Sequence, residues 1–419
     1  MRLIHTADWH LGSELHGYDR SFEHTEFLEW LLATVKAVNA DVLLVAGDIY
    51  HSVNPSVRAQ KLLFRTLFRL RESCPKLQTV LIGGNHDSPS RLELPADLLH
   101  GDHLKIIGAM GDPGESLSPL YDADGRVAAV CGAVPYLRPG DLPAPARAID
   151  GDGDGDSDET GQTRHPIAEL YEQVASAARD AYPQTPLILT GHLHVAGGAV
   201  SEMSERRLMI GGSEATPSSV FPARAIYVAL GHLHRPQTLG SAPMLRYAGS
   251  PFPMSTAERD YRHSVTQIDI DGQELRMEEI PVPRPVAFLR APERGALPLQ
   301  ELEATLSALR LAETNQERRA YLEVAVKLDG PEPDLRQKIE AALGDAPVRL
   351  TRIVRETKTT SPESAPDEDN QDLDASTPID IFARKHRDAF GVDPSPDLVA
   401  GFVALEAAAQ DPMGREDRN

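Results

Sequence analysis

The stretch "DVLLVAGD" (41–48) is apolar from Val42 to Ala46 and ends in the pair Gly47–Asp48. Because a half-exposed strand alternates apolar and polar residues, a run that is apolar on both faces predicts a strand buried inside a sheet. Five other stretches share this apolar design, and all but the one at 127–136 also end in a cluster of Gly, Asp, Asn or His. They are "RLIHTAD" (2–8), "LQTVLIGGNHD" (77–87), "VAAVCGAVPY" (127–136), "PLILTGHLH" (186–194) and "AIYVALGHLH" (225–234). Between them lie predicted helices at 21–38, 56–72 and 167–182. The alternation predicts a layered α/β domain in which functional residues gather beyond the strand ends.

At 419 residues the chain exceeds the size at which one hydrophobic core usually stops growing, so two or more domains are expected. Residues 1–275 form the first predicted domain. Residues 276–356 have the pattern of a small α+β domain. Its elements are "VAFLRA", a helical 298–309, "YLEVAVKL", a helical 333–343 and "VRLTRIV".

The composition changes again in the last part of the chain. Residues 357–377 hold almost no large apolar side chain, which predicts a disordered acidic linker. Residues 378–410 predict two short amphipathic helices, a pair too small to bury a core alone. The pair either folds back on the rest of the protein or docks onto a partner, and we favour the partner.

A predicted insertion at 141–165 is strongly acidic. Its stretch "DGDGDGDSDETG" (150–161) resembles a calcium-binding loop, with acidic residues at alternate positions and Gly155 at position 6. The bidentate acid expected at position 12 is replaced by Gly161, and the helical flanks are weak. We therefore favour a flexible acidic surface loop over a calcium site.

The formal charge of −21 argues against an obvious basic nucleic-acid binder. Much of this charge is local, because segments 141–159 and 363–374 hold thirteen acidic residues against one basic residue, Arg147. A nucleic-acid substrate is therefore not excluded, since a metal site supplies a local positive field.

Targeting features are few. The chain has no apolar run of 18 or more residues, and "MRLIHTADWHLG" at its start lacks the apolar region of a signal peptide. Cys74 and Cys131 are the only cysteines, too few for a disulfide framework. These features predict a protein of the reducing cytoplasm with no membrane segment.

Polar clusters end four groups of the predicted strands. They comprise Asp8 and His10; Asp48 and His51; Asn85, His86 and Asp87; and His192, His194, His232 and His234 of two "GHLH" segments. Each cluster alone is weak evidence, but open α/β sheets place such strand ends on one rim. Imidazole, carboxylate and carboxamide ligands without thiolates suit Mn²⁺, Fe²⁺ or Zn²⁺. A carboxylate can bridge two such ions, which together clamp a phosphate ester and activate water for its hydrolysis.

These motifs resemble the calcineurin-like metallophosphoesterase superfamily over about the first 275 residues. Within it, "HTADWHLG", "AGDIYH", "GGNHDSPSR", "LTGHLHVAGG" and "ALGHLHRPQ" closely resemble the bacterial SbcD family of nuclease subunits. Phosphatases of the superfamily usually carry Asp at the position of His51. The repair nucleases carry His there, as this sequence does. The resemblance implies a layered β-sandwich flanked by helices, then a small α+β capping domain and a C-terminal helix pair.

The resemblance also implies a role for each motif residue. Asp8, His10 and His234 would hold the first of two divalent ions, and Asp48 would bridge the two ions. The resemblance favours Mn²⁺ as the ion at both sites. Asn85, His192 and His232 would hold the second ion. His86 would protonate the leaving oxygen or orient the phosphate, and His51 would steady the phosphate in the transition state.

Other residues near these motifs receive structural interpretations. His194 is expected next to the ligands or at the surface, since the family does not require a histidine there. Asp87 is expected to cap the following helix, with Pro89 near its first turn. His5, inside a strand, is expected to be a hydrogen-bonded core residue.

The implied partners are an SbcC-type ATPase bound at 378–410, double-stranded DNA ends and hairpins. The implied activities are those of a 3′–5′ exonuclease and a hairpin endonuclease in DNA repair, recombination and replication. The implied location is the cytoplasm, in association with the nucleoid. The chain carries no Walker motif, so ATP dependence would come from the partner. The family also implies a homodimer through 56–72 and 88–100, and one side of the first helix is basic, with Arg58, Lys61, Arg65 and Arg69.

Two other functions share part of this pattern. A small-molecule or cyclic-nucleotide phosphodiesterase would use the same metal ligands but gives no reason for the capping domain or the tail helices. A non-catalytic scaffold with this fold would be expected to have lost ligands, whereas every expected ligand and His86 are present.

Overall fold

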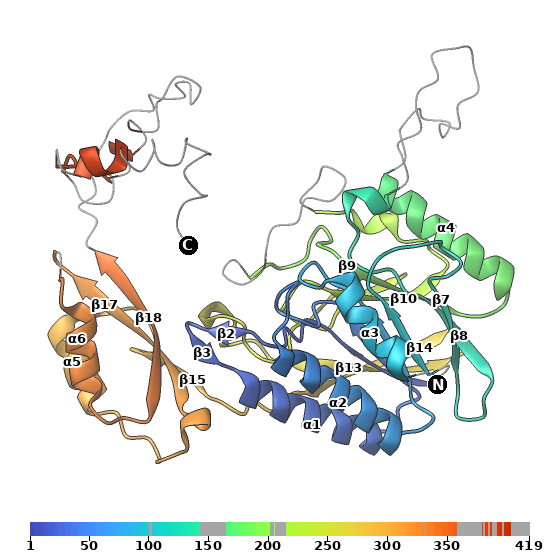
Figure 1. Cartoon of the computed structure of the whole chain (residues 1–419), viewed down its shortest axis with the longest axis horizontal. Helices are drawn as coiled ribbons and strands as arrows, with labels where there is room; N and C mark the ends of the chain where they lie inside the picture. Colours follow the sequence, from blue (N-terminus) through green and yellow to red (C-terminus); the bar gives the residue numbers. More distant parts are fainter. Residues whose placement is uncertain are drawn as a thin grey trace, which may run out of the picture. The chain divides into compact units, whose positions relative to one another are not determined.

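The computed structural model describes residues 1–99, 103–142, 165–201, 205, 215–330 and 332–357, and in the C-terminal segment 379, 382–383, 386–387, 392–395 and 398–403. The chain divides into two compact units, Met1–Lys358 and Thr359–Asn419. The first unit contains two six-stranded sheets and one four-stranded sheet (Figure 1).

The first sheet has the order β14-β13-β1-β4-β5-β6. Its strands are β1 (Arg2–Thr6), β4 (Val42–Ala46), β5 (Gln78–Ile82), β6 (Leu104–Ile107), β13 (Ser264–Asp271) and β14 (Glu274–Pro281). β1, β4, β5 and β6 run parallel, so their carboxyl ends meet at one edge of the sheet. The predicted strands at 2–8, 41–48 and 77–87 are confirmed, each with its polar end just beyond the strand.

The second sheet has the order β11-β12-β10-β9-β8-β7. Its strands are β7 (Leu117–Tyr121), β8 (Val127–Gly132), β9 (Leu187–His192), β10 (Ala225–Gly231), β11 (Gln237–Leu239) and β12 (Met244–Tyr247). β8, β9, β10 and β12 are parallel. The three strands predicted here are also confirmed, and both "GHLH" segments follow neighbouring strands of one sheet.

Alternate residues of β4 explain how the layers form. Leu43 and Val45 face a core shared with the helices α1 (Ser21–Ala37) and α2 (Val57–Ser73). Val42, Leu44 and Ala46 face a core shared with the second sheet. A strand covered on both faces needs apolar residues at every position, which is the pattern that predicted it.

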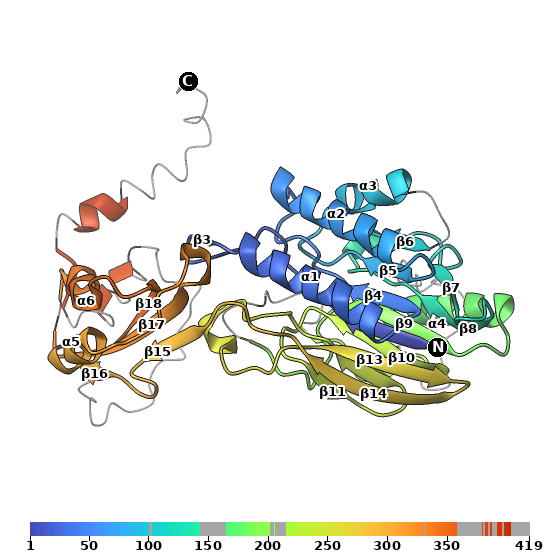
Figure 2. The ribbon, with the colours of Figure 1, turned by 90° about the horizontal axis from the view of Figure 1, so that it is seen from below.

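Helices cover the outer faces of the two sheets. They are α1 (Ser21–Ala37), α2 (Val57–Ser73), α3 (Pro89–Leu99) and α4 (Pro166–Ala181). α1 and α2 lie side by side in both views and pack on the first sheet, while α4 packs on the second (Figures 1 and 2). Ser56 begins α2, since its hydroxyl oxygen accepts the Ala59 N–H at 3.2 Å. The expected β-sandwich flanked by helices is confirmed.

The remaining sheet of the first unit has its own core. Its elements are β15 (Phe288–Ala291), β16 (Leu297–Pro298), α5 (Leu299–Ser307), β17 (Ala320–Leu328), α6 (Leu335–Leu343) and β18 (Val348–Thr357). The predicted order of strands and helices in this small α+β region is confirmed. Because β14 pairs with β13 as far as Pro281, the first sheet extends beyond the predicted domain boundary at 275.

Shorter elements complete the first unit. They are β2 (Glu14–Leu15), β3 (Tyr18–Asp19) and the 3-10 turns η1 (Pro139–Asp141), η2 (Ser218–Val220), η3 (Thr256–Glu258) and η4 (Gln316–Arg318).

In the second unit the described residues include helical stretches at 382–383, 386–387 and 398–403. The rings of Phe382 and Phe402 stack with centroids 4.4 Å apart, so residues of the two predicted tail helices contact each other. The predicted linker after residue 357 and residues 143–164 of the predicted insertion lie outside the described residues. Among the described helices, none is both long and apolar enough to span a membrane.

His5 lies in the core between the two sheets, as expected. Its Nδ1 is 2.8 Å from the Tyr227 hydroxyl, and the two rings meet edge to face. Burial, followed by the nearby Arg246 guanidinium, lowers the pKa of His5 to about 3. The folded protein therefore keeps this imidazole neutral at pH values where the unfolded chain binds a proton.

We predict that the His5→Gln variant has a flatter dependence of stability on pH between 6.5 and 3. Because the unfolded chain binds the extra proton there, wild-type stability falls as the pH drops, by about 2 kcal/mol from this group at pH 5. Urea unfolding of both proteins at pH 7.5 and pH 5 tests this. The stability gap between them should narrow by about that amount, and a constant gap would contradict the assignment.

Candidate metal centre

The predicted ligands follow the carboxyl ends of five parallel strands from both sheets. Asp8 and His10 follow β1, Asp48 follows β4, Asn85 and His86 follow β5, His192 ends β9, and His232 and His234 follow β10. The two sheets touch here, since the His192 imidazole donates its Nδ1–H to the Ala46 carbonyl at 3.0 Å. Glycine is required at Gly231, where a Cβ would lie 1.9 Å from that same carbonyl oxygen. This contact brings the ends of β4 and β9 together.

Four of these residues have left-handed backbone conformations. The φ angles are 53° at Asp8, 46° at His10, 49° at Asp48 and 95° at His232. Such conformations cost on the order of 1–3 kcal/mol each for residues other than glycine and persist where surrounding contacts fix them. Their concentration on one rim supports a functional role for these turns.

Hydrogen bonds hold the turns against one another. The Asp8 and His10 N–H groups donate to the carbonyls of Gly47 and Asp48 at 3.0 and 2.9 Å. The carboxylates of Asp8 and Asp48 each accept one backbone N–H at 2.9 Å, from His232 and His86 respectively. Each of these carboxylates therefore has one oxygen engaged in fixing a loop, and one left over.

Asp8, His10 and His234 form a first cluster whose potential ligand atoms all lie within 4.8 Å of one another. The Nε2 atoms of His10 and His234 are 3.3 Å apart. The second oxygen of Asp8, Oδ2, is buried and has no hydrogen-bond partner among the described residues. A buried carboxylate oxygen without a partner is costly unless a cation contacts it.

Asp48 and His192, again with Asp8, form a second cluster within the same distance. Asp48 Oδ2 lies 3.6 Å from His10 Nε2 and 3.4 Å from His192 Nε2. One carboxylate oxygen thus sits between imidazoles of the two predicted ion sites, where a bridging ligand belongs.

His192 provides a test of whether the residues fit a metal ion. Its Nδ1–H donates to Ala46, so Nε2 presents a lone pair in the neutral ring. That lone pair faces Asn85 Oδ1 at 3.1 Å and Asp48 Oδ2 at 3.4 Å. Three electron-rich atoms face one another, which is favourable only when a proton or a metal cation lies among them. The donor set therefore fits a divalent ion.

The pKa values agree that this rim favours positive charge. Although burial opposes it, the Asp48 carboxylate and then Asp8 raise the pKa of His192 to about 9. Burial also opposes protonation of His234, yet the Glu258 carboxylate helps to raise its pKa to about 10. The pKa of Asp48 is held well below its ordinary value despite burial, because His192 and other imidazoles surround it.

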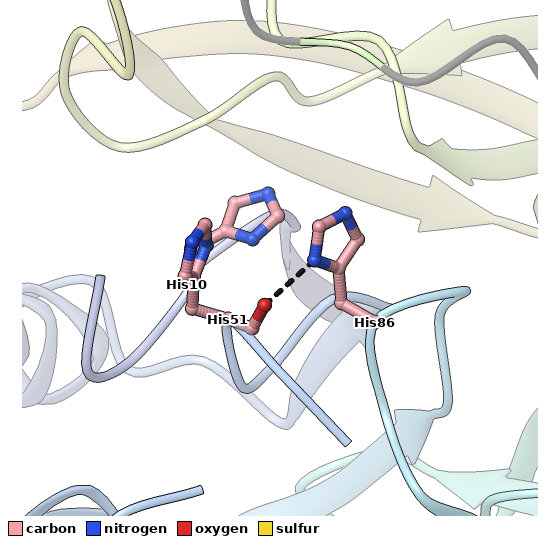
Figure 3. Close-up of side chains that lie close together, drawn as sticks. All are labelled: His10, His51 and His86. Carbon is pink, nitrogen blue, oxygen red and sulfur yellow. Dashed lines mark hydrogen bonds between the residues drawn. The ribbon is translucent and has the colours of Figure 1, made fainter. Parts of the chain in front are cut away.

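His10, His51 and His86 form a third group at the edge of the site (Figure 3). His10 and His86 are buried, whereas His51 is exposed. His86 Nδ1 donates to the carbonyl oxygen of His51 at 2.7 Å. This bond orients the imidazole of His86 and leaves Nε2 available for a proton-transfer role.

The two remaining histidines of the "GHLH" segments differ in placement. The buried His232 ring lies beside His192, with centroids 5.5 Å apart, although His232 is in none of the three clusters. His194 is half-buried and also outside these clusters. The clusters therefore include the first histidine of one segment, His192, and the second histidine of the other, His234.

The expected role of Asp87 as a helix cap is wrong. Its carboxylate accepts the N–H groups of Ile49, Tyr50 and Gly84 at 3.0, 2.8 and 2.9 Å. It therefore fastens the loop after β5 to the loop after β4. Proximity in sequence to α3 suggested the cap, whereas the actual partners are mostly about 40 positions away in the chain.

Two glutamates escaped the sequence analysis. Glu258 Oε1 accepts the Nδ1–H of His234 at 2.8 Å, and Glu205 Oε1 accepts the backbone N–H of His234 at 2.6 Å. Neither belongs to a recognisable motif, so only the fold reveals their relation to the site.

Comparisons with known proteins agree with this geometry. The family model described as calcineurin-like phosphoesterase matches residues 1–236, and one described as type 5 capsule protein repressor C-terminal domain matches residues 282–389. The SbcD subunit of nuclease SbcCD from Rhodobacter capsulatus is 40% identical over 390 residues, which cover 91% of this chain and 94% of that protein. The proteins of the same name from Escherichia coli K12 and Bacillus subtilis are 31% and 36% identical, over 85% and 67% of this chain and 85% and 69% of their own lengths. The chain is therefore a metal-dependent phosphodiesterase that belongs to the calcineurin-like phosphoesterases and, among them, to the SbcD family of SbcCD nuclease subunits.

Proposed function

We propose that this protein is a two-metal, Mn²⁺-dependent DNA nuclease that degrades duplex ends with 3′–5′ polarity and cuts hairpins and single strands. The observation that carries the proposal is the position of Asp48 Oδ2, between the His10 and His192 imidazoles at 3.6 and 3.4 Å. Such a placement suits a carboxylate shared by two ions, and paired ions suit in-line displacement at phosphorus.

In this proposal the first ion is held by Asp8, His10 and His234, and the second by Asn85, His192 and His232. Asp48 is common to both. When bound, the two ions supply positive charge to the phosphate and lower the pKa of water. Nitrogen and oxygen ligands without thiolates suit Mn²⁺, Fe²⁺ or Zn²⁺, and the resemblance to the SbcD family favours Mn²⁺ among them.

His86 is proposed to deliver a proton to the leaving oxygen or to orient the scissile phosphate. Its Nδ1–H bond to the His51 carbonyl fixes the ring while Nε2 stays unengaged by that bond. His51 is exposed at the edge of the site, which suits contact between its side chain and the phosphate of a large substrate.

We further propose that an SbcC-type ATPase binds the segment 378–410 and supplies the ATP dependence. Support comes from the relatives named as SbcCD subunits and from the family model that reaches residue 389. Exposed Val392, Leu398 and Val403 in this segment offer apolar contacts for a partner. A DNA substrate implies a cytoplasmic, nucleoid-associated location.

The predicted division into three parts remains part of this proposal, with its second boundary at 356 and its first boundary moved from 275 to the end of β14 at Pro281. A small-substrate phosphodiesterase is not favoured, because its chemistry requires neither the region 282–357 nor the tail. A scaffold without activity is not favoured either, because the rim keeps a full set of potential ligands.

We predict that His86→Ala lowers the rate of Mn²⁺-dependent DNA cleavage by roughly 10²- to 10⁴-fold, the usual contribution of a general acid. The assay uses an end-labelled linear duplex and a hairpin, with and without the co-purified ATPase. His194→Ala is the matched control, because His194 is also a motif histidine but lies outside the clusters. This variant should keep near-wild-type activity. Cleavage of bis-p-nitrophenyl phosphate or a cyclic nucleotide with DNA left untouched would instead favour the small-substrate function.

Binding of Mn²⁺ should stabilise the protein by about 2.7 kcal/mol per site at a free concentration 100 times Kd. Thermal unfolding in EDTA and in Mn²⁺ measures this effect. Asp48→Asn should lose most of the stabilisation because both ions share Asp48. Asp124→Asn, a change at an exposed carboxylate, should retain it. Equal Mn²⁺ shifts in the two variants would refute the shared-ligand role.

A homodimer through 56–72 and 88–100 is also part of the proposal. Phe68 lies in the first segment and Leu94 in the second, and their side chains are 50% and 45% exposed. Large apolar side chains that pack in the core of a monomer are buried, so this exposure supports a contact with a second copy of the chain. Phe68→Glu should convert a dimer to a monomer in light-scattering measurements after size-exclusion chromatography. Val127→Glu, at an exposed apolar residue in β8, is the control and should leave the mass unchanged. A monomeric wild-type protein would exclude the dimer.

A further inference from the structure

Glu258 is a fully buried acidic residue that no motif predicted. It ends the 3-10 turn η3 (Thr256–Glu258), 24 positions after His234, and has 0% exposure. Removing a carboxylate from water is costly unless hydrogen bonds or cations replace its hydration. The partners of this side chain therefore indicate why it is buried.

Both carboxylate oxygens of Glu258 are engaged. Oε1 accepts the Nδ1–H of His234 at 2.8 Å, and Oε2 accepts the backbone N–H of Met254 at 2.7 Å. The main chain of Glu258 is held as well, since its N–H donates to the Ser255 carbonyl and its own carbonyl accepts the Tyr261 N–H. The carboxylate is thus fixed at both oxygens, and Oε1 is directed at the His234 imidazole.

The segment that carries Glu258 is anchored from a second direction. The Arg20 guanidinium donates to the Pro253 carbonyl at 2.7 Å and lies over the Phe252 ring, 4.5 Å from its centroid. Arg20 itself is fully buried and paired with Glu23 at 2.6 Å. Residues 252–258 therefore have a rigid support at the start of α1.

The hydrogen bond from His234 fixes the tautomer of that imidazole. With the proton on Nδ1, the Nε2 lone pair is directed to the rim, 3.3 Å from His10 Nε2. A carboxylate acceptor also makes the ring a stronger electron donor than a carbonyl acceptor does. The Nδ1–H groups of His192 and His86 meet the neutral carbonyls of Ala46 and His51, so His234 differs from both.

We propose that Glu258 is a positioning residue for the first metal ion, acting through His234. It selects the tautomer of His234 that ligates through Nε2, fixes the plane of the ring, and adds negative charge behind the first ion site. The inference rests on the proposed two-metal function, because it assigns His234 to the first ion.

The test is a titration of the full chain with Mn²⁺, with free ion counted by its electron paramagnetic resonance signal. Wild-type protein should bind two equivalents. Glu258→Gln should weaken one equivalent by about 10- to 100-fold and leave the other unchanged. Glu93→Gln is the matched control, because its carboxylate accepts the Gly108 N–H at 2.8 Å in the same domain, and should bind as wild type does.

A double-mutant cycle separates action through His234 from general damage. In the His234→Ala background, Glu258→Gln should cause no further loss of affinity, since the imidazole that it positions is gone. If the Gln variant does not fold, Glu258→Asp, which keeps the charge but shortens the reach, should weaken the same single equivalent.

The possible results distinguish this inference from the proposed function. Wild-type protein that binds fewer than two equivalents would contradict the two-metal function itself. Two wild-type equivalents that are unchanged in Glu258→Gln, or weakened equally, would overturn the role of Glu258 alone. A full additional loss in the His234→Ala background would also overturn it.

Discussion

The candidate site depends on the contact between the two sheets at the ends of β4 and β9. The His192 Nδ1–H bond to the Ala46 carbonyl crosses from one sheet to the other, and Gly231 makes room for it. Since a Cβ at Gly231 would overlap the same carbonyl, no other residue fits without separating the sheets. The contact brings His192 within 3.4 Å of Asp48, although their strands belong to different sheets.

The rim that carries the candidate ligands also carries several features that lower the stability of the fold. The unpartnered Asp8 Oδ2, the left-handed turns and the closely spaced imidazoles are each unfavourable for folding. The layered cores on either side of the sheets provide the stabilisation that offsets them. Proteins commonly keep such unfavourable arrangements at functional sites, and metal ions would relieve several of them together.

A second buried network joins the α+β region after residue 282 to the part of the chain that contains the first sheet. The Tyr321 hydroxyl of β17 donates to Glu23 Oε2 at 2.7 Å, and the same carboxylate pairs with Arg20. Arg20 also donates to the carbonyl of Pro253, in the segment that leads to Glu258. Tyr321 is therefore connected through Glu23 and Arg20 to the segment that carries Glu258, the hydrogen-bond partner of His234. Buried ion pairs of this kind contribute more to geometry than to net stability.

The sequence alone determined six buried strands, their order along the chain and the chemistry at their ends. Apolar runs such as 42–46 and turns such as Gly47–Asp48 are local patterns, and a parallel sheet brings its strand ends together wherever it forms. Local patterns also predicted the helices and the small α+β region. They did not predict β6, β7, β11, β12 and β14, which are short or partly exposed and form through pairing with neighbours. They also missed the long, buried strand β13, in which polar residues interrupt the apolar ones.

Only the tertiary structure decided which atoms meet. Contacts between segments far apart in the chain place Asp48 Oδ2 between two imidazoles. Such contacts also join Asp87 to a distant loop and Glu258 to His234. A residue type and its spacing indicate what chemistry is available. The direction of a carboxylate oxygen or an imidazole nitrogen depends on packing and hydrogen bonds that local sequence does not encode.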